Sequence, residues 1–279
     1  MLKIMKINIL IRVYDRIEDL DLLLEVIHRT WKNFDYFILI VSNGKTNGYE
    51  LDAKIKSRAD KIVELHNNAG HLKGNAQLLQ EGVRYLKPDA KYTIILEADT
   101  WIYTDDIIKK YIGIMQKENS VWASAQWYSR FYSLATDFAI INTDFLLSNT
   151  EIFDYTGYPE CYSANFIIEK KRIYIYIKEN MPVHVPGYIK KYPFAPKSRF
   201  YMFPKSGMIT HHIEELKGSM EEKKYCFNAI AGKDFFETDY KGIPYNKYIN
   251  KLMLAIKLSK LLPNRTWVSK PRQAKIATK

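Results

Sequence analysis

Apolar and polar positions alternate in two different periods along the first half of the chain. Short apolar runs rich in β-branched residues predict buried strands over 7–13, 37–41, 62–65 and 92–96. Between them, apolar residues recur every three or four positions, which predicts helices over 19–28, 51–59 and 78–86. Strands and helices that alternate with short connections favour an α/β fold of three layers with a mostly parallel central sheet.

The pattern is less regular in the second half. It predicts helices over 105–116 and 161–169, a turn at 157–159, and strands over 122–127, 138–142 and 208–210. The segment 181–204 is rich in Pro, Tyr, Lys and Arg, which fits either a lid that contacts an acceptor or a packed surface loop. Apolar residues at helical spacing predict a last helix that ends before Pro263.

Composition narrows the class of protein. A chain of 279 residues with 47% hydrophobic and 14% aromatic side chains can bury a large core. No apolar run reaches the roughly 20 residues that span a bilayer, and residues 1–6 lead into a strand rather than a signal peptide, so we expect a cytoplasmic protein. Cys161 and Cys226 form no metal motif and are expected to be reduced thiols. The net charge of +11 favours a nucleotide, a nucleic acid or an acidic membrane as partner.

Two carboxylates follow the fourth predicted strand. Glu97 and Asp99 are separated by one residue, so their side chains point the same way on an extended segment. Ligands of open α/β sheets bind beyond the carboxyl ends of strands, and two such carboxylates can hold one divalent cation. The alternative is a strand that ends in two solvated acids.

Four segments, taken in order, resemble the signatures of family 2 glycosyltransferases, which have the GT-A fold. Residues 13–16 (Val-Tyr-Asp-Arg) are similar to the Thr-Tyr-Asn-Arg signature after the family's first strand, and residues 41–44 (Val-Ser-Asn-Gly) to its second-strand turn. Residues 68–75 resemble its Asn-x-Gly-x-x-x-small-Asn segment. Residues 97–99 (Glu-Ala-Asp) stand where the family has its Asp-x-Asp metal motif, and Trp101 and residues 105–106 (Asp-Asp) also fit. The resemblance covers roughly residues 7–110 and is diffuse beyond them.

The resemblance implies a glycosyltransferase, of hexosyltransferase type, that uses Mn²⁺ or Mg²⁺ and a nucleotide-sugar donor, with a UDP-sugar favoured. The cation would neutralise charge on the pyrophosphate leaving group. Asp99 is implied to coordinate it directly, and Glu97 to act through water or on the ribose. The other implied donor-binding residues are Val13, Tyr14, Asp15, Arg16, Asn43, Asn68, Lys73 and Ala98. Solvent exposure is the alternative for Lys73. The chain departs from the family at Val13, at the second-strand acid (Ser42 or Asn43 here) and at Glu97.

Two further groups are candidates for the chemistry. His211 and His212 follow the predicted strand 208–210, and the resemblance implies that a late histidine completes the metal site; strand alternation lets only one of them face it. The alternative is a histidine that packs at the strand end. An inverting transferase also needs a base for the acceptor hydroxyl. Glu160 is the closest match to the family's position, Asp154 and Asp144 compete with it, and an ordinary surface acid is the alternative for each.

The C-terminal segment carries much basic charge. Its predicted helix has an apolar stripe, and Leu254 and Leu258 lie on the opposite side. The stripe consists of Tyr245, Tyr248, Ile249, Leu252 and Ile256. A helix placed between the core and another surface fits this pattern. The hypothesis is docking, together with the basic tail after Pro263, on an anionic membrane that carries a lipid-linked acceptor; a packed helix with a disordered tail is the alternative.

The expected organisation is a catalytic domain over 1–240, with a donor half (1–110) and an acceptor half (111–240), and a helical, basic extension over 241–279. The expected reaction is sugar transfer to a hydroxyl of a glycan or lipid-linked acceptor, with inversion, in cell-surface polysaccharide biosynthesis. Nucleic acid is disfavoured as partner because zinc-finger spacing, ribonucleoprotein motifs and a basic recognition helix are missing from the sequence. A sugar nucleotidyltransferase would carry a Gly-rich phosphate loop after the first strand, which residues 14–16 do not supply. An inactive transferase-like binding protein is the third class, motivated by Glu97 and Val13.

Overall fold

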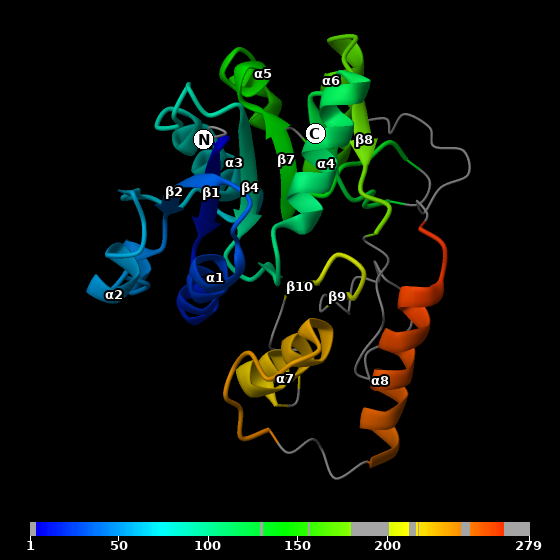
Figure 1. The fold of residues 1–279 in the computed structure, drawn as a ribbon. Helices are drawn as coiled ribbons and strands as arrows, with labels where there is room; N and C mark the ends of the chain where they lie inside the picture. Colours follow the sequence, from blue (N-terminus) through cyan, green and yellow to red (C-terminus); the bar gives the residue numbers. More distant parts are fainter. Residues whose placement is uncertain are drawn as a thin grey trace. The chain divides into compact units, whose positions relative to one another are not determined.

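The computed structural model describes residues 4–128, 131–155, 157–179, 201–211, 216, 218–240 and 246–264 (Figure 1). For residues 246–253 it describes the backbone only. The chain divides into two compact units. Unit 1 comprises the described residues within Met1–Ala98 and Asp105–Ile177, and unit 2 those within Asp99–Thr104 and Lys178–Thr266. The predicted domains 1–240 and 241–279 divide the chain by expected function rather than by compactness, and they stay predictions.

Unit 1 is built on a seven-stranded sheet in the order β3-β2-β1-β4-β7-β6-β8. The strands are β1 Lys6–Val13, β2 Asp35–Ser42, β3 Lys61–Glu64, β4 Tyr92–Glu97, β6 Trp122–Ser124, β7 Phe138–Asn142 and β8 Tyr174–Tyr176. Neighbours are parallel from β3 to β4 and between β6 and β8, whereas β7 is antiparallel to both β4 and β6. This confirms the predicted α/β fold with a mostly parallel sheet.

Helices cover both faces of this sheet. Leu10, Leu39, Ile95 and Ala139 are aligned across four strands, and they belong to a core that also contains side chains of α3, α5, η2 and α6. The residues between them in each strand point to the opposite face, where α1 and α4 bury their apolar sides. Figure 1 shows α1 and α4 in front of the sheet and α3 behind it. The elements are α1 Ile17–Thr30, η1 Lys45–Asn47, α2 Ala53–Lys56, α3 His71–Val83, α4 Asp106–Glu118, α5 Thr143–Leu147, η2 Thr150–Phe153 and α6 Pro159–Glu169.

Unit 2 contains a small antiparallel sheet, β5-β10-β9, and two helices. Its elements are β5 Trp101–Ile102, β9 Tyr201–Phe203, β10 Met208–Thr210, α7 Ser219–Ala231 and α8 Asn246–Leu261. The core is aromatic: Trp101 packs against Phe227 and Phe236, with ring centroids 5.7 and 5.4 Å away. None of the described helices combines the length and apolar character that a membrane-spanning helix requires.

Most predicted elements are present, and the differences have local causes. The helix expected over 51–59 shortens to α2, which Asp52 caps by accepting a hydrogen bond from Ile55 N (2.7 Å) and in which only Ile55 is buried. The strand expected over 122–127 ends at Ser124, where its pairing with β7 and β8 ends. The sequence pattern did not predict η1, β5, α5, η2, β8 or α7. The segment 181–204 lies outside the described residues up to 200, and residues 201–203 form β9 instead of an irregular loop.

Candidate functional site

The carboxyl ends of β1, β2 and β4 lie side by side, because β1 is the parallel neighbour of both other strands. Backbone hydrogen bonds extend the pairing: Asn43 N donates to Val13 O (3.3 Å) and Ala98 N donates to Arg12 O (3.1 Å). Val13, Asn43 and Ala98 are all buried, so they shape this edge through backbone position and packing.

A glycine lets the loops after β1 and β2 meet. A Cβ atom on Gly44 would lie 2.0 Å from the carbonyl oxygen of Tyr14 and 2.9 Å from Cβ of Tyr49, distances that no side chain tolerates. The close approach places the Tyr14 and Tyr49 rings 5.2 Å apart in edge contact and allows Asn47 Nδ2 to donate to the Tyr14 hydroxyl (2.7 Å). Tyr14 is therefore fixed at the carboxyl edge by contacts from the next strand's loop.

A cavity of about 540 Å³ opens at this edge between the loops that follow β1, β2 and β3. Tyr14, Thr46, Asn47, Asn67, Asn68 and Gly70 line it. Its volume lies within the range of small-molecule sites, and its lining offers amides, hydroxyls and an aromatic face but no charged side chain. Tyr14, Asn68 and Gly70 come from predicted donor-binding segments, whereas Thr46, Asn47 and Asn67 were missed because single polar loop residues carry no sequence signal.

The segment from Asn68 to Gly74 forms a tight entry into α3. Asn68 Oδ1 accepts a hydrogen bond from Gly70 N (2.8 Å), and Gly70 has a φ of 89°, which a side chain would disfavour. Asn43 Nδ2 donates to the carbonyl oxygen of Gly74 (3.3 Å). A Cβ on Gly74 would lie 2.4 Å from Asn68 Oδ1, which explains why a small residue stands in this segment.

Other predicted donor-binding residues lie at the surface of this edge. Asp15 is exposed and Arg16 Nε lies 3.7 Å from its carboxylate, so the two side chains partly offset each other's charge. Lys73 is exposed in the first turn of α3, as expected for the alternative of a solvent-exposed lysine. Contacts of these three side chains with a donor stay predictions.

Arg12 is a residue that the sequence analysis missed. It pairs with Glu97 across adjacent strands, with Arg12 Nη2 2.5 Å from Glu97 Oε1, and the same nitrogen donates to the carbonyl oxygen of Thr136. The Arg12 side chain is 3% exposed and that of Glu97 is 27% exposed. A single arginine inside an apolar strand, directly beside the predicted acidic strand end, was the available signal for this ion pair.

Asp99 and His211 come together within unit 2. One carboxylate oxygen of Asp99 and one ring nitrogen of His211 lie within 4.8 Å of each other, a separation comparable to that of two ligands of one cation. The flanking residues Thr100 and Thr210 join the same segments through their hydroxyls (2.6 Å). His211 has a φ of 73°, so the chain turns sharply after β10. His212 lies outside the described residues.

A fully buried lysine holds the Asp99 segment. Lys223 on α7 donates from Nζ to the carbonyl oxygen of Asp99 (2.7 Å), and Nζ lies 4.2 Å from the centre of the Trp101 ring. The first interaction holds the backbone of the predicted ligand Asp99 itself, and the second holds the aromatic side chain two residues after it. α7 therefore fixes the position from which the Asp99 carboxylate extends.

The three candidate bases have different surroundings in unit 1. Glu160 lies in the first turn of α6. Burial raises the pKa of the Tyr155 hydroxyl, the charge of Arg12 lowers it, and the carboxylates of Glu160 and Glu97 raise it further, so Glu160 and Glu97 lie within electrostatic range of one phenol.

The other two candidates lie elsewhere. Asp154 accepts a hydrogen bond from Gln80. Gln80 lies nine residues after the start of α3, so this contact is roughly 13 Å along the helix from the end that faces the carboxyl edge. Asp144 is exposed on α5. A catalytic role for any of the three acids stays a prediction.

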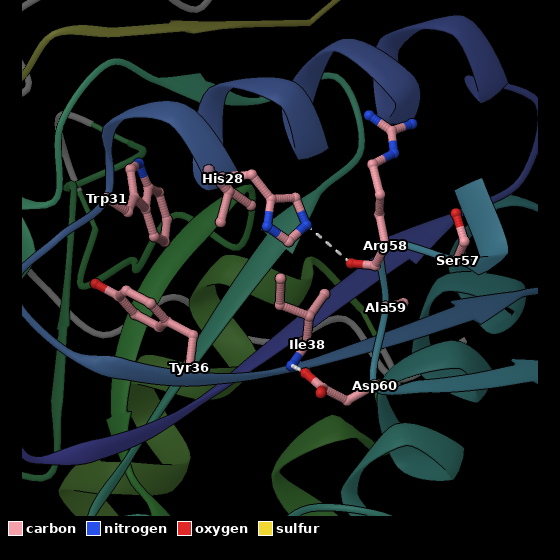
Figure 2. Close-up of a pocket in the computed structure, with 9 residues that line it drawn as sticks. His28, Trp31, Tyr36, Ile38, Ser57, Arg58, Ala59 and Asp60 are labelled. Carbon is pink, nitrogen blue, oxygen red and sulfur yellow. Dashed lines mark hydrogen bonds between the residues drawn. The ribbon is translucent and has the colours of Figure 1, made fainter. Parts of the chain in front are cut away.

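A second cavity, of about 310 Å³, lies at the amino end of β2 (Figure 2). Trp31, Tyr36 and Ile38 form part of its wall. Its polar groups are engaged by the protein: His28 Nε2 donates to the carbonyl oxygen of Arg58 (3.0 Å) and Asp60 accepts from Ile38 N (2.7 Å). This cavity lies at the edge of the sheet opposite to the predicted donor site. Its hydrogen bonds join the residues before β3 to α1 and to β2, which is a structural role.

No family model matches the chain, and no curated protein matches it. Solved structures of similar fold include S. aureus TarS (13% identity, TM-score 0.42, covering 57% of this chain and 33% of TarS). Another is the mannosyltransferase PcManGT from Pyrobaculum calidifontis in complex with GDP-Man and Mn²⁺ (11% identity, TM-score 0.47, 91% of this chain and 72% of that one). A third is 4-diphosphocytidyl-2C-methyl-D-erythritol synthase from Anaerococcus prevotii (12%, 0.44, 62% and 88%). The chain thus spans about a third of the length of TarS.

Proposed function

We propose that this protein is a metal-dependent glycosyltransferase that uses a nucleotide-sugar, with a UDP-sugar as donor. The observation that carries the proposal is the 540 Å³ cavity at the carboxyl edge of the sheet. Tyr14, Asn68 and Gly70 come from two segments more than 50 residues apart in sequence, both identified as donor-binding, and they line this one cavity. Ligand binding at this edge is the general behaviour of α/β sheets.

The cavity lining suits a nucleoside. The uracil ring presents one N–H donor between two carbonyl acceptors, and the side-chain amides of Asn47 and Asn67 supply both donors and acceptors. The Tyr14 ring offers a flat apolar surface for the base or ribose. The first turn of α3 begins directly after Gly70, and its backbone N–H groups favour the negative charge of the diphosphate.

The donor set at the metal position fits Mn²⁺ or Mg²⁺. Carboxylate oxygens suit both cations, and the imidazole of His211 favours Mn²⁺. Asp99 and His211 would hold the cation, which when bound offsets the charge that develops on the diphosphate. Glu97 stands two residues before Asp99, but its carboxylate is engaged by Arg12, so we assign it to the ribose or to a water-mediated contact.

Glu160 is assigned as the base. Its carboxylate accepts the proton of the acceptor hydroxyl while that oxygen bonds to the anomeric carbon of the sugar. The bond from the anomeric carbon to the diphosphate oxygen breaks, and its electron pair leaves with the nucleoside diphosphate. A single displacement of this kind inverts the anomeric centre. We propose a hydroxyl of a glycan or lipid-linked acceptor in cell-surface polysaccharide biosynthesis as the nucleophile.

A donor-binding protein without transferase activity is the second candidate. The ion pair between the buried Arg12 and the partly buried Glu97 favours it, because a carboxylate neutralised by an arginine is a poorer cation ligand than a solvated one. This protein would use the same cavity and the same donor. Turnover, rather than binding, separates the two functions.

The test is a panel of UDP-, GDP- and dTDP-sugars, each with and without Mn²⁺, followed by thermal unfolding and by donor hydrolysis. We expect a UDP-sugar with Mn²⁺ to raise the Tm, since a ligand at about 100 times its Kd stabilises by about 2.7 kcal/mol. Asp99→Ala should lose the Mn²⁺-dependent part of the shift, whereas the exposed Asp89→Ala should retain it.

Glu160→Gln should keep the donor-induced shift and lose turnover. A shift without turnover in the unsubstituted protein would establish the binding protein instead. Failure of every donor to change the Tm or to be hydrolysed would exclude both functions.

A further inference from the structure

The positive charge of the chain is concentrated at its C-terminal end. Residues 240–279 contain ten of the 42 lysines and arginines and none of the 31 acids. The first 239 residues therefore hold 32 basic and 31 acidic residues, a net charge of only +1 against +11 for the whole chain. A charge that is confined to 40 residues indicates a local anionic partner rather than a generally basic protein.

Helix α8 lies in this basic segment and has two different faces where its side chains are described. Ile256 and Ser259 are buried at 2% and 9% exposure, and α8 contacts α7. Leu254, Leu258 and Leu261 are 55%, 51% and 81% exposed. At 100° per residue these leucines fall within roughly 60° of one another, on the side opposite to Ile256 and Ser259.

Lysines border the exposed leucines on one side of the helix, with Lys257 roughly 40° and Lys260 roughly 100° around from Leu261. Lys257 and Lys260 are both exposed, and the 16 residues of α8 include no acid. Lys205 Nζ donates to the carbonyl oxygen of Leu262 and to Asn264 Oδ1 (2.7 Å), and Asn264 Nδ2 donates to Glu179 (2.8 Å). These bonds hold the C-terminal end of α8, so the leucines stand on a fixed helix.

We propose that the outer face of α8 docks on an anionic phospholipid bilayer, with Leu254, Leu258 and Leu261 entering the headgroup region and Lys257 and Lys260 contacting lipid phosphates. An apolar stripe bordered by lysines is the pattern of helices that lie in a membrane interface. Exposed leucines together with lysines favour a membrane over other partners. A nucleic acid gains nothing from exposed leucines. A second copy of α8 would bring lysines against lysines. The proposal does not depend on the donor chemistry.

The experiment is sedimentation of the full chain with vesicles of phosphatidylcholine alone or with roughly one third phosphatidylglycerol. We expect binding to the anionic vesicles only, weakened by added salt. Each lysine near an anionic surface contributes about five-fold in affinity, so Lys257→Gln/Lys260→Gln should bind about 25-fold more weakly. Leu254→Ser/Leu258→Ser/Leu261→Ser should reduce binding at least ten-fold with an unchanged Tm, because the substituted side chains are exposed.

Ile173→Ser is the matched control, since Ile173 is 54% exposed in unit 1, and it should bind like the unsubstituted protein. Equal binding to neutral vesicles, or unchanged binding of the serine variant, would overturn the proposal. So would a dimer that the serine substitutions convert to a monomer without loss of vesicle binding, or RNA binding of the same strength in the serine variant and the parent.

Discussion

At the scale of single residues, the candidate site depends on a few residues whose surroundings allow almost no other residue type. Arg12 is a charge buried within the sheet, and its partners are one carboxylate and one backbone carbonyl. Gly44 and Gly74 stand where a Cβ atom would collide with the neighbouring loop. Such positions tolerate few substitutions, and each can be tested by a single change.

Removal of Arg12 should destabilise the protein strongly. Arg12→Met leaves the partly buried Glu97 without its cation, and loss of one partner of a buried ion pair costs about 3 kcal/mol. Urea unfolding measures the change, and Arg12→Met/Glu97→Leu should recover part of it. Arg84→Met, which breaks an exposed pair with Glu81, should leave the midpoint nearly unchanged. Equal effects of Arg12→Met and Arg84→Met would contradict a buried role for the pair.

Two glycine-to-alanine substitutions should act in opposite directions. A Cβ on Gly74 meets Asn68, so Gly74→Ala should lower the free energy of unfolding by about 1–3 kcal/mol and weaken donor binding. Gly113 lies in the interior of α4, is exposed and has open space around the Cβ position, so Gly113→Ala should stabilise by about 0.5–1 kcal/mol. Chemical denaturation gives both values, and a stabilised Gly74→Ala protein would show that Asn68 can move aside freely.

At the scale of elements, one buried acid ties the start of α4 to the strand β2. Asp105 accepts hydrogen bonds from Asn33 N, from Asn33 Nδ2 and from the Tyr36 hydroxyl, each at 2.7 Å. Burial, followed by this hydrogen bond and the charge of Asp105, raises the pKa of Tyr36 far above its ordinary value of 10.0. The neutral phenol is thus strongly preferred in the folded protein.

The shift predicts a loss of stability at alkaline pH. The contribution of Tyr36 is fully present below its unfolded pKa of about 10 and is lost as the pH rises above it, because the unfolded phenol ionises first. Tyr36→Phe should be less stable than the parent at pH ~7, since Asp105 loses a donor, but should lose less stability between pH ~9 and ~11. Parallel urea midpoints of the two proteins over this range would contradict the assignment.

At the scale of the whole molecule, the candidate chemistry is distributed over two units. The cavity, Glu97 and Glu160 belong to unit 1, whereas Asp99, His211 and Lys223 belong to unit 2. Only Ala98 separates Glu97 from Asp99, so the peptide chain itself links the acid that ends β4 to the first predicted metal ligand. The net charge belongs to neither group of candidate residues, because nearly all of it lies after residue 239.

The sequence alone determined the alternation of strands and helices, the parallel direction of the first four strands and the carboxyl-edge segments. It did so because hydrophobic period, glycine geometry and turn chemistry are local. It also isolated the Leu254 and Leu258 side of α8 from the stripe that contains Ile256. Local pattern cannot identify partners that are distant in sequence. The antiparallel insertion of β7, the Arg12–Glu97 pair and the approach of His211 to Asp99 were therefore decided by tertiary structure. The β4–β7 pairing, the Arg12–Glu97 pair and the approach of His211 to Asp99 each join groups separated by more than 40 residues, and only packing determines which such groups meet.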